Sequence, residues 1–134
     1  MAKLCLKNQQ FMDLISNAIL VPVPLHWRKK LMREYNQSEC FAMELCKYAK
    51  TSKVINLLRK HKHTKPQVGL LAEERLVNLN RAFSLRKCAC KIDKLTKIVI
   101  IDDVLTTGAT LSQCALVLKN HGFKNVHIAS FVRT

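Results

Sequence analysis

The sequence is poor in several residue types, and each shortage excludes a class of protein. It contains only 3 glycines and 3 prolines in 134 residues, which describes a globular chain and not a low-complexity linker. No apolar run approaches the length of a membrane span, and no signal-peptide pattern opens the chain, so we expect a cytoplasmic protein. Aromatic residues make up 6% of the chain, too few to supply a stacking platform for single-stranded nucleic acid by themselves.

Cysteine pairs of the kind that hold structural zinc are also missing. Of the 6 cysteines, none stands in a C-x-x-C spacing, and Cys88 and Cys90 form only a CAC pair. The 5 histidines are too scattered to suggest a metal site. We therefore expect reduced, mostly structural thiols and no zinc.

Positive charge is what the sequence has in excess. Its 23 lysines and arginines stand against 9 acidic residues, giving a net charge of +14. Such a balance favours phosphate-rich ligands, nucleic acid or an acidic membrane surface, and a solvated basic surface without a specific partner remains an alternative. With 49% hydrophobic residues, the chain is long enough for one domain, residues 1–134, with a core of its own.

The most specific stretch is IVIIDDVLTTGAT, from Ile98 to Thr110. Its first four residues are apolar and β-branched, the pattern of a strand buried on both faces, and we expect Asp102 and Asp103 where this strand ends. The small residues from Thr106 to Thr110 then lead into a helical apolar periodicity. Because a helix N-terminus offers free N–H groups and Gly108 permits close approach, this turn should bind an anion.

Two carboxylates beside an anion site point to a ligand that carries both a phosphate and hydroxyl donors. Ionised Asp102 and Asp103 can accept hydrogen bonds from the two hydroxyls of a ribose, while the Thr106 to Thr110 turn holds its 5-phosphate. A sugar phosphate fits both requirements. The alternative is an ordinary Asp-containing turn and a capped helix in some other α/β protein.

The remaining pattern predicts alternating strands and helices. We expect helices over about 8–17, from a cap at Asn36 or Ser38 to Ala49, over 73–79, and after Gly108 as far as Gly122, with strands at 19–23, 54–58, 82–85, 98–101 and 126–132. The inner face of the second helix should carry Phe41, Ala42, Leu45, Tyr48 and Ala49. This order implies the α/β class, a mainly parallel sheet of about five strands flanked by helices, with a ligand at the carboxyl ends of the strands.

The same residues match a family pattern. The stretch from Ile98 to Thr110 resembles the phosphoribosyl-pyrophosphate (PRPP) signature of type I phosphoribosyltransferases, and every fixed position of that signature is filled. The flanking pieces are similar to the ComF family of competence-associated, phosphoribosyltransferase-like proteins from about Ile19 to the C-terminus. They are VPVPLHWRKK, REYNQSE and the spaced residues Gln67, Gly69, Leu70, Arg75, Asn78, Ala82 and Phe83.

The resemblance implies site residues and a cofactor. Asp102 and Asp103 would be the catalytic acids that hold the ribose hydroxyls, directly or through Mg²⁺, and the 5-phosphate would be bound by Thr106, Thr107, Gly108, Ala109 and Thr110. The loop after the first strand would face the pyrophosphate, with Arg28, Lys29 and Lys30 as its candidate cations. The segment from Arg59 to Lys65 is either a loop that closes over the site or an exposed loop.

The sequence departs from the ComF pattern in two places. Members commonly carry an N-terminal region with paired C-x-x-C motifs, which we do not find here, so no zinc site is implied. Glu34 and Tyr35 also stand where Gly-Phe is usual before Asn36 and Gln37. Two functions therefore stay open: a Mg²⁺-dependent phosphoribosyltransferase in DNA uptake or nucleotide metabolism, and a non-catalytic competence module that binds single-stranded DNA and uses the PRPP pocket for binding or sensing.

Overall fold

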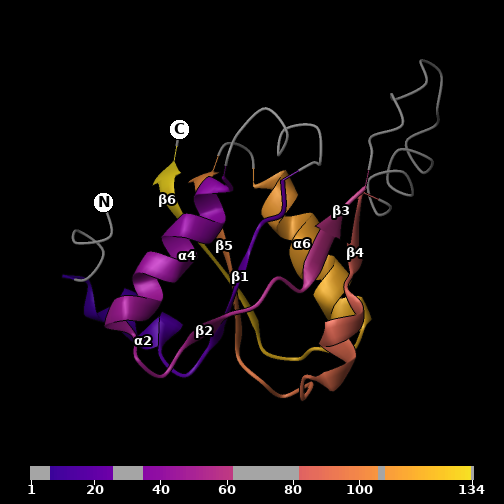
Figure 1. The fold of residues 1–134 in the computed structure, drawn as a ribbon, viewed down its shortest axis with the longest axis horizontal. Coiled ribbons are helices and arrows are strands. Elements are labelled where there is room, and N and C mark those ends of the chain that lie inside the picture. Colours follow the sequence, from indigo (N-terminus) through magenta and orange to yellow (C-terminus); the bar gives the residue numbers. More distant parts are fainter. Residues whose placement is uncertain (1–6, 26–34, 62–81, 106–107, 134) are drawn as a thin grey trace.

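The structure is a computed structural model that describes residues 7–25, 35–61, 82–105 and 108–133. Helices and strands alternate through most of the described chain, as Figure 1 shows. The elements are α2 (Gln9–Ile15), β1 (Ile19–Pro22), α4 (Gln37–Tyr48), β2 (Lys53–Val54), β3 (Leu58–Lys60), β4 (Phe83–Leu85), the 3₁₀ helix η1 (Lys87–Lys91), β5 (Ile98–Leu105), α6 (Ala109–Asn120) and β6 (Val126–Arg133). The helix expected over 73–79 lies outside the described residues.

The main sheet is parallel throughout, which confirms the predicted fold class. Its strand order is β2-β1-β5-β6, and in its centre Ile19 of β1 pairs with Ile98 of β5, which pairs in turn with Val126 of β6. The described residues place four strands in this sheet and not about five, because β3 and β4 form a separate antiparallel pair. No described helix is long and apolar enough to cross a membrane.

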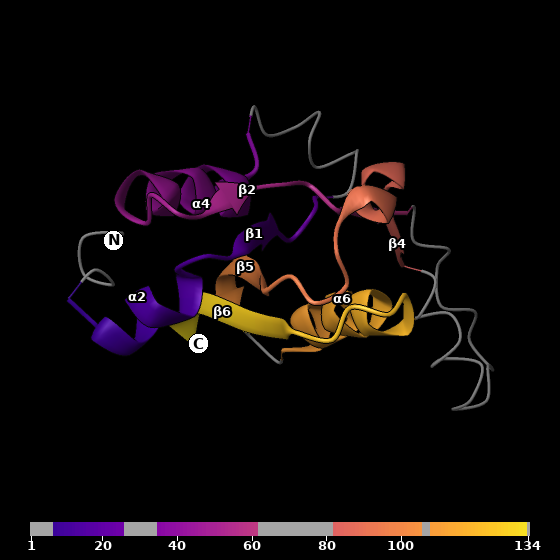
Figure 2. The same cartoon turned by 90° about the horizontal axis from the view of Figure 1, so that it is seen from below.

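Helices cover both faces of the sheet, as the period-two alternation of its strands requires (Figure 2). Ile98 and Ile100 pack with Leu111, Cys114 and Leu118 of α6 on one face. Their neighbours on β5, Val99 and Ile101, pack on the other face with residues of α2 and α4, namely Ile15, Ala42 and Leu45. The strand that leads into the candidate site is therefore anchored on both sides.

The central strand is longer than the sequence predicted. We expected it to end at Ile101, but β5 continues to Leu105. It does so because β6 pairs with it over this length, with Asp102 opposite Ser130 and Leu105 opposite Arg133. Its other neighbour stops early, since Pro22 of β1 pairs with Ile101 and β1 goes no further. Asp102 and Asp103 are thus strand residues that lie beyond the end of β1.

The strand predicted over 54–58 was wrong, because this segment divides into two strands. β2 ends at Val54, and the Leu57 N–H donates to the Ile55 carbonyl at 3.0 Å, a three-residue turn centred on Asn56. Leu57 and Leu58 are then buried beside α6, and β3 pairs with β4 from Leu58 opposite Leu85 to Lys60 opposite Phe83. The strand expected over 82–85 is present as β4, but it is antiparallel.

The helix ends follow the predicted signals closely. Asn36 caps α4, and its inner face carries Ala42, Leu45 and Ala49 as expected, whereas Tyr48 is 41% exposed because it lies at the last turn. Gly122 follows α6 with φ +94°, and the N–H groups of Gly122 and Phe123 donate to the carbonyls of Lys119 and Leu118. These two bonds make the Schellman arrangement that ends a helix at a left-handed residue.

Candidate functional site

The candidate site lies where β5 runs past the end of β1. Beside this step stands the N-terminus of α4, whose Ser38 contacts Asp102, and α6 begins at Ala109, four residues after the end of β5. Parallel strands deliver their carboxyl ends to the same edge of a sheet, so side chains that follow β1 and β5 meet there. The two acidic residues of the signature are therefore at the edge where a ligand is expected.

Asp102 is held in place by two hydrogen bonds. Its Oδ1 accepts the Ser38 hydroxyl at 3.2 Å and the Asp103 backbone N–H at 2.9 Å. Burial raises the pKa of Asp102 above its usual value of 3.8, and the neighbouring Asp103 carboxyl raises it further, while the bonds from Ser38 and the Asp103 amide act against the rise. A cation or a hydroxyl-bearing ligand beside the pair would relieve this repulsion.

Ser38 links Asp102 to the loop that follows β1. The residue is 4% exposed, and its backbone N–H donates to the Asn36 side-chain oxygen at 3.1 Å. The Asn36 amide in turn donates to the Val23 carbonyl at 3.0 Å. A chain of hydrogen bonds thus joins the end of β1, the cap of α4 and the acid. The sequence predicted Ser38 only as a possible cap of this helix. Its hydrogen bond to Asp102 could not be predicted, because that bond depends on the register of the sheet.

The residue before α6 has a left-handed backbone conformation, which a glycine adopts readily. Gly108 adopts φ +77° at the N-cap, in the left-handed region that side chains disfavour, and its carbonyl accepts the Ser112 N–H at 2.9 Å. Ala109 and Thr110 occupy the first turn of α6. Thr106 and Thr107 lie outside the described residues, and the binding of a phosphate at this turn stays a prediction.

Several other predicted residues cannot be placed. The candidate pyrophosphate cations Arg28, Lys29 and Lys30 fall outside the described residues, as do Glu34 and the segment 62–81 with Gln67, Gly69, Leu70, Arg75 and Asn78. Tyr35, the second departure from the family pattern, is described and 58% exposed. The structure therefore brings together the acids, the α6 N-terminus and the α4 N-terminus, and leaves the cationic loop as a prediction.

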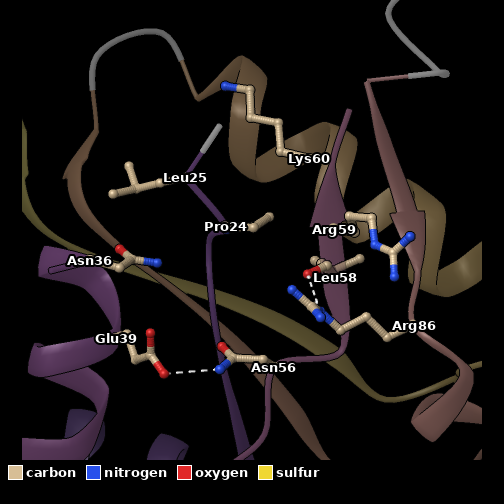
Figure 3. A pocket seen from close by; sticks show the side chains of 9 residues that line it. All are labelled: Pro24, Leu25, Asn36, Glu39, Asn56, Leu58, Arg59, Lys60 and Arg86. Carbon is tan, nitrogen blue, oxygen red and sulfur yellow. Dashed lines mark hydrogen bonds between the residues drawn. The ribbon is translucent and has the colours of Figure 1, made fainter. Parts of the chain in front are cut away.

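A pocket of about 210 Å³ lies next to this site, and no sequence motif predicted it. It is lined by Pro24, Leu25, Asn36, Glu39, Asn56, Leu58, Arg59, Lys60 and Arg86, which come from four segments of the chain, as Figure 3 shows. We call it the Arg86 pocket. Arg86 donates from Nε to the Leu58 carbonyl at 3.3 Å, and Asn56 donates to the Glu39 carboxylate at 2.9 Å.

The described cysteines are all free thiols. Cys114 is buried under the site in α6, where burial above all, and also the charge of Asp102, raises its pKa to about 12. Cys40, Cys88 and Cys90 are exposed, so the expectation of mostly structural thiols does not hold for these three. Within the part of the chain that the structure describes, no three metal-ligating side chains gather in one place.

Comparisons with known proteins agree with the fold. Residues 38–134 match the model of the phosphoribosyl transferase domain. The chain is 31% identical over 114 residues to Competence protein F of Haemophilus influenzae and 30% identical over 115 residues to the DNA utilization protein YhgH of Escherichia coli K12. These alignments cover 85% and 86% of this chain but 49% of each relative, so the chain spans about half the length of these proteins.

A solved structure shows the same fold at low sequence identity. A hypoxanthine phosphoribosyltransferase from Staphylococcus aureus superposes with a TM-score of 0.56 at 16% identity, covering 99% of this chain and 62% of the other. At that identity the likeness concerns the fold alone. The match to the phosphoribosyl transferase domain and the competence-protein relatives confirm the resemblance to ComF-like proteins of the phosphoribosyltransferase type.

Proposed function

Because the chain belongs to the phosphoribosyl transferase domain family, we propose that it binds PRPP and transfers or recognises its phosphoribosyl group. The names of its relatives, a competence protein and a DNA utilization protein, support a role in DNA uptake or nucleotide metabolism. The observation that carries the proposal is the placement of Asp102 and Asp103. They lie past the end of β1, with Asp102 held by Ser38, on the strand that leads to the left-handed Gly108 and the N-terminus of α6.

This arrangement matches the two ends of a ribose phosphate. The N-terminal turn of α6 offers backbone N–H groups and the positive end of the helix dipole to the 5-phosphate. The carboxylates accept hydrogen bonds from the ribose 2- and 3-hydroxyls, and the Ser38 and Asp103 N–H bonds fix the Asp102 carboxylate in one orientation. The sugar is thereby held at both ends, with its anomeric carbon turned toward the acceptor.

The donor set also fits Mg²⁺, which prefers carboxylate oxygens and usually keeps several waters. Asp102 Oδ1 is engaged by Ser38 and the Asp103 N–H, so its second oxygen and the Asp103 carboxylate are the groups that would hold the ion. When bound, Mg²⁺ supplies positive charge that stabilises the departing pyrophosphate. Displacement at the anomeric carbon passes through a state with positive charge on the sugar, which the two carboxylates stabilise directly.

Thermal unfolding tests the proposal. PRPP with Mg²⁺ should raise the melting temperature of the chain by roughly 8 to 13 °C at 100 times its dissociation constant, because binding to the native state alone contributes about 2.7 kcal/mol. Ribose 5-phosphate should give a smaller rise, since it lacks the pyrophosphate. No stabilisation by PRPP up to millimolar concentration would contradict the proposal.

A second function rests on the charge of the chain. The net charge of +14 and the exposed Arg59, Arg86 and Lys87 supply cations for the phosphates of single-stranded DNA. Between residues that the structure describes, an ion pair joins Lys47 and Glu44 at 2.6 Å. Affinity for single-stranded DNA should then fall steeply between low and physiological salt. Binding too weak to detect even at low salt would exclude this second function.

A further inference from the structure

The outer side of β6 is a long strand edge with which no described strand pairs. The main sheet has the order β2-β1-β5-β6, so β2 and β6 are its two edges among the described strands. β2 has only 2 residues, whereas β6 has 8 (Figure 1). Short strands, lysines and prolines are common means of protecting an edge from other chains. The sequence of β6, VHIASFVR, is long and contains neither lysine nor proline, so this edge can pair with a further strand.

The backbone groups that face outward follow from the register with β5. The Ile98 N–H donates to the Asn125 carbonyl at 2.8 Å, and Ile98 lies opposite Val126. In a parallel pair, alternate residues then direct both N–H and C=O toward the neighbouring strand, and the residues between them direct both groups away from it. The residues of β6 that direct them away from β5 are Val126, Ile128, Ser130 and Val132. Each presents one donor and one acceptor at the edge.

A groove of about 520 Å³ lies along the same edge. Leu116 and Lys119 of α6, His127 and Ile128 of β6, and Leu14 of α2 are among the residues that line it. Leu116 is 44% exposed and Ile128 48%, so the groove offers apolar surface to solvent. Because α6 and α2 cover opposite faces of the sheet, the groove reaches both faces at the edge (Figure 2). An added strand, whose side chains alternate between the two faces, needs this shape.

The charge at the groove restricts the partner. Lys119 is a cation, His127 becomes one when protonated, and none of the described lining residues is acidic. A second copy of the chain, paired edge to edge across a two-fold axis, would bring two basic grooves together, and each copy carries a net charge of +14. An acidic strand is attracted both by Lys119 and by the charge of the whole chain.

We propose that this edge of β6 and its groove bind an extended, acidic segment of a partner protein, which adds a strand to the sheet. The backbone of the segment pairs with the outward N–H and C=O groups, its apolar side chains pack on Leu116 and Ile128, and a carboxylate lies beside Lys119. In strand addition, the backbone hydrogen bonds supply affinity and the alternate side chains supply selectivity. The inference is independent of the proposed function, because none of the residues assigned to the phosphoribosyl site lines this groove.

A synthetic peptide with the length of β6, about 8 residues, tests the surface on the full chain. Valine and isoleucine alternate in it with glutamate and threonine. Fluorescence anisotropy should show binding at micromolar to millimolar peptide. Hydrogen exchange followed by NMR should show the N–H groups of Ile128 and Ser130 slowed at least about tenfold, because they enter hydrogen bonds. The same peptide methylated on alternate backbone nitrogens should not bind, because it lacks the donors.

Two variants and a control separate the charge from the strand pairing. Lys119→Glu should weaken peptide binding roughly threefold or more, because an attraction becomes a repulsion. Lys53→Glu is the matched control, since it makes the same charge change at an exposed residue of β2, on the opposite edge of the sheet, and should leave binding nearly unchanged. Ile128→Pro removes an outward N–H and no hydrogen bond to β5, so the fold, checked by circular dichroism, should persist while binding is lost.

Three results would overturn the inference. Equal binding of a peptide with lysine in place of glutamate would show that the charge of the groove does not select the partner. Unchanged exchange at Ile128 and Ser130 in the presence of bound peptide would place the peptide elsewhere. A concentration-dependent dimer in sedimentation that protects the same two amides, without any peptide binding, would show that a second copy of the chain occupies the edge.

Discussion

Removal of the Ser38 hydroxyl should destabilise the chain in a pH-dependent way. Ser38→Ala deletes the bond to Asp102 Oδ1, which measures 3.2 Å and lies at the long end for a hydroxyl donor. Hydrogen bonds to charged groups contribute roughly 1.5 to 3 kcal/mol, and the length of this one places it at the lower limit. Alanine recovers about half a kcal/mol through its better helix propensity, so we expect a net loss of about 1 kcal/mol at neutral pH.

The sign of the pH dependence follows from the charge of Asp102. The Ser38 hydroxyl stabilises the ionised carboxylate and so acts to lower its pKa, against the larger rise caused by burial. Its contribution to stability is therefore present above the folded-state pKa of Asp102 and is lost as the pH falls through that value. Wild type and Ser38→Ala should differ most at pH 7.5 and converge in acid.

Urea unfolding at pH 7.5 and at acidic pH measures both effects, and a loss of about 1 kcal/mol corresponds to roughly 3 to 5 °C in melting temperature for a chain of this length. Ser112→Ala is the matched control, because Ser112 is exposed on α6, whereas Ser38 is buried and bonded to Asp102. A Ser38→Ala variant that loses the same stability at both pH values would show that the hydroxyl acts by packing and not through the Asp102 charge.

Three further predictions concern the fold and the thiols. Gly122→Ala should cost about 1 to 2 kcal/mol in urea unfolding, because φ is +94° while an added Cβ would meet nothing closer than the Lys94 side chain at 3.9 Å; an unchanged midpoint would refute the left-handed cap. Cys114, with its pKa raised to about 12, should resist iodoacetamide at pH 8 in the folded chain, and alkylation as fast as at Cys88 would contradict its burial. Elemental analysis of protein purified without chelator should find no stoichiometric zinc, and one tightly held zinc per chain would mean that the Cys88 and Cys90 region was misinterpreted.

The strand-to-helix signature could be predicted from sequence because its information is local. Within 13 residues, four β-branched residues predict the strand, two acids follow them, and the small residues after the acids include the glycine that adopts the left-handed conformation, Gly108. The length of β5 could not be predicted in this way. It depends on β6, whose pairing with Asp102 and Leu105 is set by residues more than 25 positions away.

The missed features are those that depend on distant segments. The run from Val54 to Leu58 has a strand composition, yet it turns at Asn56, and Leu57 and Leu58 are buried in the core cluster that also contains residues of α6. The bond between Ser38 and Asp102 joins residues 64 positions apart, and the Arg86 pocket combines four segments. No periodicity in the sequence carries that information.

The binding of PRPP to a variant with both acids replaced tests the central claim most directly. Asp102→Asn with Asp103→Asn keeps the shape of both side chains and removes both charges, so the ribose hydroxyls and Mg²⁺ lose their acceptors while the α6 N-terminus is unchanged. Each lost charge-assisted bond is worth roughly 1.5 to 3 kcal/mol, so calorimetry should show PRPP binding weakened at least about tenfold. Sulfate, which needs only the helix N-terminus, should bind as well as before or slightly better. Unchanged PRPP affinity in the folded double variant would contradict the account and make the two aspartates ordinary residues of a strand end.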